Sequence, residues 1–467
     1  MSELPTSWAW APLAAVTSDA VQKEPAAKEQ FFYIDIGSVD RNTKQISWPQ
    51  ALVGNDAPSR ARKLIRVGDT LVSMTRPILN AVALVPEHLD GQIASTGFDV
   101  LRPCGVDPRW LIYLVRTQAF IDDMSSLVKG ALYPAVRSKD VRGYLVPVAP
   151  SNEQKRIADQ LDSLIARVNA CNDRFDGIPA ILKRLRQSLL AAATSGELTE
   201  DFRVATQSNE VIGAFPAEWT PATVGSVAND LRYGTSKKCQ YSETGIGVLR
   251  IPNISENGRI DARDLKRAHF DTVELKKLAL KPGDLLIIRS NGSVDLVGKT
   301  CVVSESEKGL LFAGYLIRLR LNTSVVLPAF MRMCLAEPVQ RQRIEQASKS
   351  TSGVNNINAD ELRALPVWLP PIAEQAEIVR RVESLFAIAD RLEAQCTTAR
   401  AQVARLTPLL LAKAFRGELV PQDPADEPAS ELLARLCQRR ADNSAGSSKR
   451  RGAKPGYASV ARSASSA

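Results

Sequence analysis

The stretch Ile157-Ala-Asp-Gln-Leu161-Asp-Ser-Leu164-Ile-Ala-Arg-Val168-Asn-Ala-Cys171 decides the architecture of this chain. Its apolar residues alternate steps of four and three, and the alternation continues without a miss to Leu189. More than four unbroken heptads are typical of a coiled-coil helix rather than an ordinary surface helix. The apolar positions of this series are Ile157, Leu161, Leu164, Val168, Cys171, Phe175, Ile178, Leu182, Leu185 and Leu189.

A second series with the same heptad phase follows 221 residues later. Proline removes one helical hydrogen bond, so Pro179 and Pro408 are each predicted to kink their helix. The two prolines stand at non-equivalent positions, and the two bends should therefore differ. The second series consists of Ile378, Val382, Leu385, Ala389, Leu392, Cys396, Ala399, Val403, Leu406 and Leu410.

Short motifs outside the two helical series also occur twice, in the same order. Their separations grow smoothly from 211 to 221 residues, which chance matches between common turn residues would not produce. The chain is therefore a tandem duplication. The pairs are Pro5-Thr-Ser-Trp8 with Pro216-Ala-Glu-Trp219, Gly68-Asp69 with Gly283-Asp284, Gly97-Phe98 with Gly314-Tyr315, Pro108 with Pro328, Glu153-Gln154 with Glu374-Gln375, and Gly196-Glu-Leu198 with Gly417-Glu-Leu419.

Each copy changes texture once, from mixed to purely helical. Short β-prone runs such as Asp284-Leu-Leu-Ile-Ile-Arg289 come first, and Asp107-Pro108 predicts a helix with Asp107 as N-cap. We therefore predict an α+β fold, in which each copy is an α+β domain followed by a long helix. The two helices should pair as an antiparallel coiled coil with pseudo-two-fold symmetry. The expected boundaries are 1–150 for the first domain, 151–200 for the central helical region, 201–211 for a linker, 212–370 for the second domain, 371–420 for the distal helical region, and 421–467 for a disordered basic tail.

The composition is ordinary for a globular protein, with 45% apolar and 24% charged residues among 467. The formal net charge of +9 favours a polyanionic partner such as nucleic acid. The seven cysteines are scattered and form no Cys-x-x-Cys pair, so neither a disulfide framework nor a zinc site is expected. Met1–Ala20 lacks the pattern of a secretory signal, and no apolar run approaches the ~18 residues of a membrane span. We expect a cytoplasmic protein with no membrane partner.

No catalytic or cofactor motif is found in the sequence. The two histidines, His88 and His269, have no cysteine or carboxylate at ligand spacing. The stretch from Gly292 to Thr300 resembles a phosphate loop, but five residues separate its glycines where that loop needs four. It is predicted to be a turn that leads into a strand. There is neither a Gly-x-Gly-x-x-Gly nor an Asn-Pro-Pro-Tyr motif, so the pattern indicates binding rather than catalysis.

The helical regions resemble those of one known family. Pro150-Ser-Asn-Glu153-Gln154-Lys-Arg-Ile157 and its counterpart from Pro371 to Ile378 resemble the start of the conserved helices in type I restriction–modification specificity subunits. The stretches from Ile178 to Phe202 and from Leu410 to Leu419 resemble the ends of those helices. The likeness covers nearly the whole chain, up to about residue 420, and the Pro-x-x-Trp motifs at the start of each copy fit it as well.

The resemblance implies a non-catalytic subunit that reads double-stranded DNA. Each α+β domain would be a target-recognition domain that reads one half of a split sequence. Each helical region would dock one of two adenine-N6 methyltransferase (modification) subunits, and restriction/translocase subunits would join them. We expect no cofactor in this chain, with S-adenosylmethionine, ATP and Mg in the partner subunits. From Ile157 to Leu189 the helix would span ~48 Å, or on the order of 14 base pairs.

Base-contacting residues are nominated by their chemistry, because target-recognition domains vary freely within this family. Lys and Arg suit phosphates, whereas Arg, Lys, Asn, Gln and Ser suit base edges in the major groove. For each candidate the alternative is an ordinary solvated side chain. The candidates are Arg60, Arg62, Arg76, Lys129, Tyr133 and Arg137 in the first domain, and Lys237, Lys238, Arg289, Asn291, Lys349, Asn355 and Asn356 in the second.

Other functions stay open at this stage. The chain could serve a DNA-modifying system that methylates without restriction, or could be a coiled-coil adaptor with no nucleic-acid role. The basic run Lys449-Arg450-Arg451 in the tail could be an arm that contacts the DNA backbone or a solubilising segment.

Overall fold

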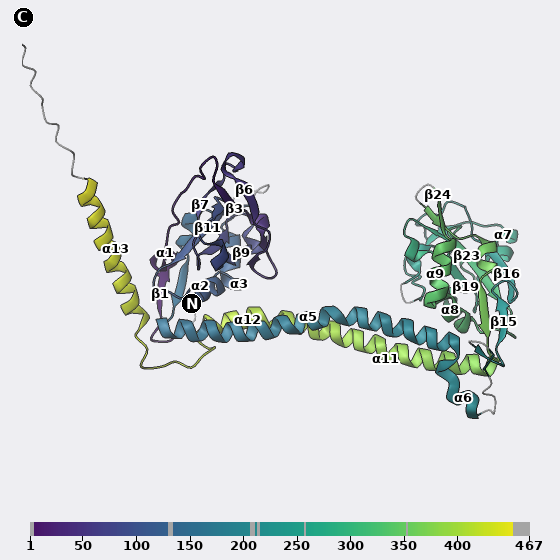
Figure 1. Ribbon diagram of the computed structural model, residues 1–467. Helices are drawn as coiled ribbons and strands as arrows, with labels where there is room; N and C mark the ends of the chain where they lie inside the picture. Colours follow the sequence, from purple (N-terminus) through teal and green to yellow (C-terminus); the bar gives the residue numbers. More distant parts are fainter. Residues whose placement is uncertain are drawn as a thin grey trace, which may run out of the picture. The chain divides into compact units, whose positions relative to one another are not determined.

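The chain forms two compact units in the computed structural model, which describes residues 4–128, 134–205, 211–212, 215–255, 258–351 and 354–451. The first unit comprises Met1–Arg174 with Ala399–Ala467, and the second comprises Phe175–Thr398 (Figure 1). Each unit contains one α+β domain and parts of two long helices, α5 (Ser151–Ser195) and α11 (Ile372–Ala404). Within the described ranges no helix is long and apolar enough to cross a membrane.

The domain of the first unit has two four-stranded sheets. Its strands are β1 (Ala9–Pro12), β2 (Thr17–Ser18), β3 (Gln30–Ile34), β4 (Val39–Asp40), β5 (Gln45–Ile46), β6 (Gln50–Val53), β7 (Ala61–Leu64), β8 (Thr70–Ser73), β9 (Val82–Leu84), β10 (Ile93–Ser95), β11 (Phe98–Pro103) and β12 (Leu145–Val148). The sheet orders are β6-β3-β10-β7 and β2-β11-β8-β9, and β1 pairs with β12. The helices are α1 (Leu13–Val16), α2 (Pro108–Leu114), α3 (Gln118–Ser126) and α4 (Ser138–Arg142).

The domain of the second unit has a four-stranded sheet in the order β16-β23-β19-β21, a three-stranded sheet in the order β18-β17-β22, and a further small sheet in the order β20-β25-β24. Its strands are β13 (Val211–Ile212), β14 (Phe215–Pro216), β15 (Thr220–Thr223), β16 (Ala228–Tyr233), β17 (Ile246–Leu249), β18 (Lys266–Ala268), β19 (Leu285–Ile288), β20 (Ser290–Asn291), β21 (Thr300–Val302), β22 (Leu311–Phe312), β23 (Leu316–Leu321), β24 (Lys349–Thr351), β25 (Val354–Asn356) and β26 (Pro366–Leu369). The helices are α6 (Glu200–Ala205), α7 (Thr272–Leu278), α8 (Pro328–Ala336), α9 (Pro338–Ala347) and α10 (Ala359–Arg363).

The strand pairings confirm the duplication. The pair β1/β12, which joins the start of the first domain to its end, has the counterpart β15/β26 in the second. Each domain also contains one parallel pair, β3/β10 in the first and β17/β22 in the second. The run β11-β8-β9 corresponds to β23-β19-β21. The strand pairs that the two copies share have the same order of parallel and antiparallel partners, which indicates one ancestral unit.

The doubled Glu-Gln motif fastens each domain to its long helix. Glu153 accepts a hydrogen bond from the indole N–H of Trp8 (2.9 Å), and Glu374 accepts the same bond from Trp219 (3.1 Å). Each glutamine beside these residues accepts from the backbone at the start of a domain helix, Gln154 at Asp107 (2.9 Å). The four motif side chains are buried, where an unsatisfied polar group is costly. The recurring Pro-x-x-Trp and Glu-Gln motifs are thus two halves of one joint.

The doubled Gly-Asp motif forms a turn held by an ion pair. Gly68 and Gly283 both adopt left-handed backbone angles (φ 81° and 85°), which glycine tolerates without strain. The aspartate after each glycine is buried and receives two hydrogen bonds from an arginine of the neighbouring strand, Asp69 from Arg102 at 2.7 and 2.9 Å. Asp284 receives the equivalent pair from Arg320.

Local predictions for the helix starts and turns are confirmed. Asp107 is the N-cap of α2, and its carboxylate accepts from the backbone N–H of Arg109 (2.8 Å). The stretch that resembles a phosphate loop is a turn with one short 3₁₀ segment, Val294–Leu296, and it leads into β21.

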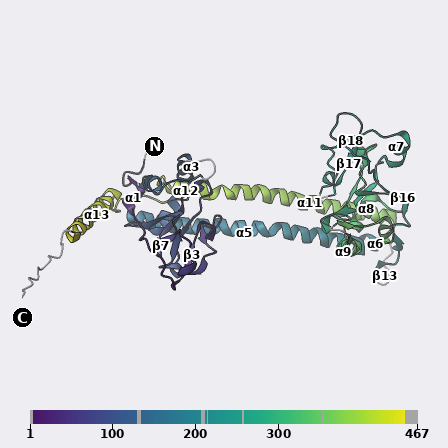
Figure 2. The same ribbon diagram turned by 90° about the horizontal axis from the view of Figure 1, so that it is seen from above.

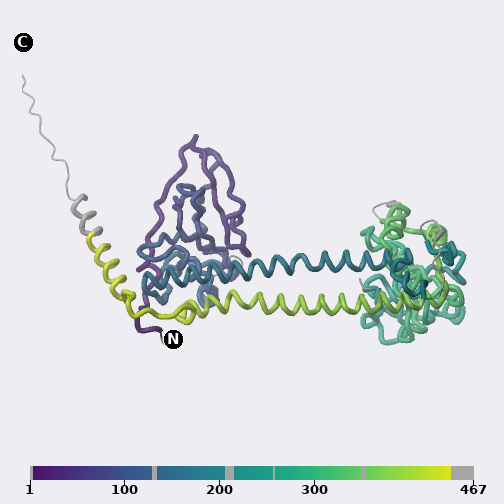
Figure 3. The backbone as a smooth tube through the Cα atoms, turned by 60° about the horizontal axis from the view of Figure 1, so that its bottom comes forward, coloured from purple at the N-terminus to yellow at the C-terminus, as the bar shows by residue number. Residues whose placement is uncertain are grey.

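The two long helices pair within each unit. In the second unit Arg186 of α5 donates to Asp390 of α11 (2.8 Å), whereas Leu198, farther along the chain, meets the earlier residue Arg381 (2.9 Å). Later residues of one helix thus meet earlier residues of the other, so the pairing is antiparallel (Figure 2). Figure 3 shows the course of the two helical segments as a backbone tube. In the first unit Ile157 and Leu161 of α5 share a core with Leu411 of α12 (Leu406–Ala414).

The strict heptad prediction fails at four positions of the two series. Cys171, Leu185, Leu392 and Leu406 are exposed although the pattern placed them on the apolar seam. An α-helix drifts by ~20° per heptad relative to a 3.5-residue repeat, so the buried positions move by one residue after several turns. In α5 the predicted position Leu182 is buried, but the next buried positions are Leu190 and Ala193, one residue after those of the strict repeat.

The two prolines have different effects on the helices. The predicted interruption near Pro408 is present, because α11 ends at Ala404 and α12 begins at Leu406. Ala404 carries the carbonyl that the missing N–H of Pro408 would have bonded. By contrast, α5 continues as one helix through Pro179.

The prediction of a disordered tail is wrong for most of the segment after Pro428. Residues Ala429–Arg451 form helix α13, and Leu432 and Leu436 are buried against the first domain. Arg440 also donates to the carbonyl of Thr17 (2.8 Å). Two leucines four residues apart form an apolar stripe of one turn, which an average over the Ser-, Ala- and Gly-rich tail conceals. Residues 452–467 lie outside the described part of the chain.

Candidate nucleic-acid interface

Five of the candidate residues in the second domain come together on and beside the small sheet β20-β25-β24. Asn291 is paired with Asn355, and Asn356 is paired with both Ser290 and Lys349. Arg289 directly precedes β20. The sheet joins segments about 60 residues apart in sequence, 290–291 and 349–356. The described residues therefore place an arginine and three asparagines on one local surface.

Arg289 is held in a defined orientation on this surface. Its Nε donates to the side-chain oxygen of Asn356 (3.2 Å), and its guanidinium carbon lies 4.5 Å from the ring centroid of Tyr233. The Tyr233 hydroxyl in turn accepts from the backbone N–H of Ala359 (2.9 Å), which fixes the ring. A stacked and hydrogen-bonded guanidinium loses little rotamer freedom on binding.

The terminal nitrogens of Arg289 are available for a ligand. Within the described residues they make no hydrogen bond or ion pair, whereas Nε is used internally. An arginine that presents both terminal N–H groups matches the two acceptors of guanine in the major groove. The carboxamides of Asn291 and Asn355 hold the adjoining turn, since Asn291 accepts from Ser293 N–H (2.9 Å) and Asn355 donates to Gly292 O (3.0 Å).

The first domain places Arg76 at the position that Asn291 occupies in the second. Val136 donates its N–H to the carbonyl of Met74 (2.9 Å), as Ile357 does to that of Arg289 (2.9 Å). The residue after Met74, Thr75, forms a bridge with Ala135, and exposed Arg76 donates its N–H to Pro134 O (2.7 Å). The same backbone arrangement thus presents different side chains in the two copies.

The other candidates of the first domain are less clearly connected to this surface. Arg137 is exposed and is the N-cap residue of α4, directly after the segment that pairs with Thr75. Arg60 and Arg62 lie beside or on β7, in the other sheet, and Arg62 is bound to Glu24 (2.9 Å). Lys129 and Tyr133 lie outside the described residues, so the structure does not place them.

The two lysine candidates of the second domain differ in freedom. Lys237 donates to Glu274 (3.1 Å) and to the carbonyl of His269 (2.8 Å), and its ammonium lies 4.9 Å from the centroid of Phe270. Lys238 is exposed. Lys237 is therefore committed to the fold of its loop, whereas Lys238 suits a phosphate contact.

Sequence reasoning missed the aromatic residues of this surface. Tyr233 is 38% exposed and Tyr315 is 63% exposed, and the Tyr315 carbonyl accepts from the N–H of Arg289 (2.9 Å). The first copy has buried Phe98 where the second has Tyr315. That substitution was a signal within the sequence, since Tyr gains a polar end at a position where Phe is buried.

A strained turn lies next to Arg76. Three non-glycine residues of the described chain have left-handed backbone angles, Lys44, Arg76 and Asn80, and the last two flank the 3₁₀ segment Pro77–Leu79. The Lys44 ammonium donates to Asn80 O (2.6 Å), and burial, together with the charge of Arg116, lowers the pKa of Lys44 to about 8. Such angles cost on the order of 1–3 kcal/mol each and often mark functional segments.

Similarity to known proteins extends over nearly the whole chain. The specificity subunit of the type I restriction enzyme EcoKI from Escherichia coli K12 is 32% identical over 458 residues, which cover 94% of this chain and 97% of the relative. The chain belongs to the family of type I restriction enzyme specificity subunits. The StySPI specificity subunit from Salmonella potsdam is 31% identical and covers 94% of this chain and 96% of its own length. No protein-family model matches this specificity subunit.

Solved structures agree with this assignment. The HsdS subunit from Thermoanaerobacter tengcongensis has a TM-score of 0.63 with 27% identity, covering 90% of this specificity subunit and 99% of that chain. A chain from a structure of the type I R-M system, described for its complex assembly and conformational transition, has a TM-score of 0.69 with 27% identity, covering 90% and 100%. Specificity subunits are the non-catalytic component that recognises the DNA target and directs the partner subunits.

Proposed function

We propose that this specificity subunit reads a split double-stranded DNA target, with one half-site contacted by each α+β domain. The duplicated geometry supports this proposal. Each domain presents a polar surface from the same segment, at Arg76 in the first and at Arg289 with Asn291 in the second. Because these residues differ between the copies, the two half-sites should differ in sequence.

The surface around Arg289 supports direct reading of bases. The guanidinium group of Arg289 is oriented by Tyr233 and Asn356, and its two terminal nitrogens make no hydrogen bond within the described residues. A bidentate arginine–guanine contact gives ~1–3 kcal/mol of discrimination against the wrong base. Exposed cations such as Lys238, Arg60 and Arg137 suit phosphates, which add affinity without sequence information.

The long helices are proposed to dock two adenine-N6 methyltransferase subunits, one for each helical region. Restriction/translocase subunits would join this core, with S-adenosylmethionine, ATP and Mg bound by the partners as the cofactors of methylation and restriction. The near-repeat of the helical regions supports two equivalent docking sites. We also propose a cytoplasmic location, which the proposed DNA target and the scattered free thiols support.

The proposal is tested by selecting duplexes from a random library with the reconstituted specificity–methyltransferase complex. We expect enrichment of two short fixed sequences separated by a gap of constant length. Enrichment of one contiguous sequence, or of none, would contradict the split target. A methylation-only system is distinguished by assaying the complex isolated from its host cells for ATP-dependent cleavage of unmethylated target DNA, which such a system would lack.

A further inference from the structure

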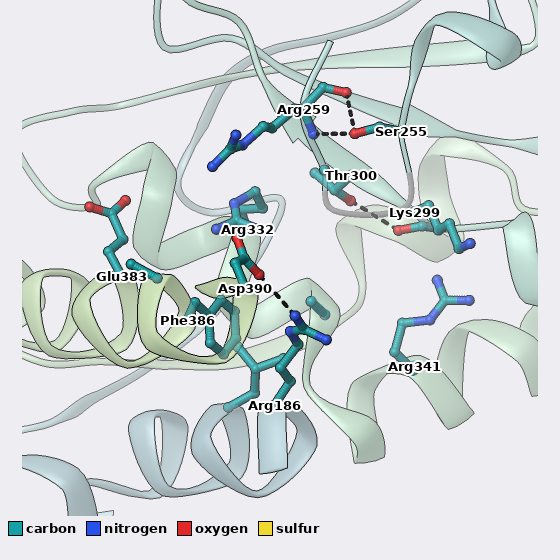
Figure 4. Close-up of a pocket in the computed structure, with 15 residues that line it drawn as sticks. Arg186, Ser255, Arg259, Lys299, Thr300, Arg332, Arg341, Glu383, Phe386 and Asp390 are labelled. Atoms are coloured by element: carbon teal, nitrogen blue, oxygen red, sulfur yellow. Dashed lines mark hydrogen bonds and ion pairs between the residues drawn. The ribbon is translucent and has the colours of Figure 1, made fainter. Parts of the chain in front are cut away.

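The second unit contains a pocket of about 620 Å³ between its α+β domain and the paired helices α5 and α11 (Figure 4). Its size falls in the range of small-molecule sites. Five cationic side chains line it: Arg186, Arg259, Lys299, Arg332 and Arg341. They come from α5, from two loops of the domain, and from α8 and α9.

The lining carries an excess of positive charge. Among the lining residues that the structure describes, two carboxylates, Glu383 and Asp390, accompany the five cations. Arg186 forms ion pairs with Asp390 (2.8 Å) and with Glu393 (2.8 Å), so the Asp390 carboxylate already has a cationic partner. Arg341 also forms an ion pair with Glu345 (3.4 Å), which lies outside the lining. The described lining itself holds more cations than carboxylates, and the pocket is therefore suited to an anion.

Two of the arginines are largely withdrawn from water. Burial lowers the pKa of Arg332 and of Arg341, with desolvation as the main cause in both cases. Arg341 donates to the carbonyls of Val297 (2.6 Å) and Asp295 (3.0 Å). Arg332 makes no hydrogen bond or ion pair within the part of the chain that the structure describes. Withdrawing a charge from water without a partner is costly, and a bound anion would offset that cost.

The first copy shows that the fold does not need these cations. Counting from the prolines that begin α2 and α8, Ile112 stands where Arg332 does and Ile121 where Arg341 does. Val82 pairs with Val72 as Thr300 pairs with Ile287, so Ala81 corresponds to Lys299. Ile112 and Ala81 are buried in the first domain. The same scaffold thus folds around aliphatic side chains at all three positions.

Glu383 of the pocket has also lost the partners that its counterpart in the first copy has. The counterpart of Glu383 in the first copy is Asp162, which binds Arg109 (2.8 Å) and the hydroxyl of Tyr113. Ala329 and Met333 replace those two partners in the second copy. The second copy has therefore exchanged a closed polar cluster for an open cationic pocket.

We propose that this pocket binds a free phosphate-bearing anion of nucleotide size, with Arg332 as the principal contact and Arg341 and Lys299 beside it. Guanidinium groups match phosphate oxygens through two parallel N–H···O bonds, which are among the strongest hydrogen bonds in proteins. A di- or triphosphate fills the pocket better than a single phosphate and balances its excess charge. The proposal is independent of which DNA sequence the chain reads.

The test is isothermal titration calorimetry of the full chain with pyrophosphate and with ATP. The variant Arg332→Ile installs the residue that the first copy carries, so it should fold. We expect it to weaken binding of both anions by about 10- to 100-fold, the loss of one or two charge-assisted hydrogen bonds. Arg343→Gln, on the same helix as Arg341 but outside the pocket, should bind like the unchanged chain.

Each outcome decides the matter. Absence of pyrophosphate and ATP binding up to millimolar concentration by the unchanged chain would overturn the proposal, as would equal binding by Arg332→Ile. A random-sequence duplex is titrated in parallel to separate the two sources of phosphate. If Arg332→Ile weakens the duplex and leaves pyrophosphate unaffected, the pocket serves the DNA backbone and the proposal of a free anion is wrong. If Arg332→Ile enriches the same duplexes from the random library as the unchanged chain, the proposed DNA function stands whether or not the pocket binds an anion.

Discussion

Arg289→Met should remove recognition of one base pair in the second half-site and leave the fold intact. The first copy carries Met74 at this place in the same backbone arrangement, so methionine is compatible with the scaffold. The stacking on Tyr233 and the bond to Asn356 exist without DNA, and only the two terminal nitrogens of Arg289 remain for a base. Their bidentate contact is worth ~1–3 kcal/mol of discrimination, or about 5- to 150-fold.

The assay is fluorescence anisotropy of the reconstituted specificity–methyltransferase complex at fixed salt. The target duplex is compared with duplexes that each carry one changed base pair in the second half-site. Arg289→Met should bind the target about 5- to 150-fold more weakly and become indifferent to one of the changed pairs. Lys238→Met, the matched control, should weaken all duplexes alike and reduce the salt dependence by about one phosphate contact. If Arg289→Met still discriminates against every changed base pair, the terminal guanidinium nitrogens of Arg289 do not contact a base.

Three further predictions concern stability and geometry. The pKa of Lys44 is about 8 in the folded chain against an ordinary 10.5, so between these pH values the unfolded chain binds more protons and the free energy of unfolding should rise with pH. In urea denaturation at pH 7 the variant Lys44→Met should therefore be more stable than the unchanged chain, and this difference should shrink toward pH 10.5. A difference that stays constant with pH would contradict the prediction. The double variant Leu432→Ala/Leu436→Ala should lower the free energy of unfolding of the first unit by about 4 kcal/mol or more. The control Leu409→Ala, whose side chain is 59% exposed, should change it by less than ~0.5 kcal/mol. Equal effects of the two would show that α13 does not stabilise that unit. Seven residues added to each long helix, after Arg174 and after Thr398, should lengthen the gap between the half-sites by ~3 base pairs, at about 1.5 Å per residue. An unchanged gap in an active variant would show that the length of the helices does not set the gap.

The architecture was largely readable from the sequence because it is written twice. Glu153-Gln154 and Glu374-Gln375 mark equivalent joints, and their side chains make equivalent bonds to a tryptophan and to a helix start. Helix α13 was missed, since two buried leucines in a tail of small and basic residues leave composition nearly unchanged. The exposed seam positions such as Leu185 were missed because a fixed seven-residue period ignores helical drift.

The candidate interface was only partly predictable. Residue chemistry nominated Arg289, Asn291, Asn355 and Asn356, but their assembly depends on the pairing of β20 with β25, which no local pattern specifies. Chemistry also could not separate Lys237, which is bound to Glu274, from exposed Lys238. Such differences arise from tertiary contacts between segments about 30 to 70 residues apart. The stacking role of Tyr233 was not visible for the same reason.

The central claim, that each domain reads its own half of the target, is tested most directly by mapping methylated adenines in cells. The cells express the methyltransferase subunit with this chain or with a chimera whose residues 1–150 come from another specificity subunit. We predict that the chimera changes one half-site sequence, retains the other unchanged, and keeps the same gap between them. A chimera that still methylates both original half-sites, or that changes both at once, would contradict the account.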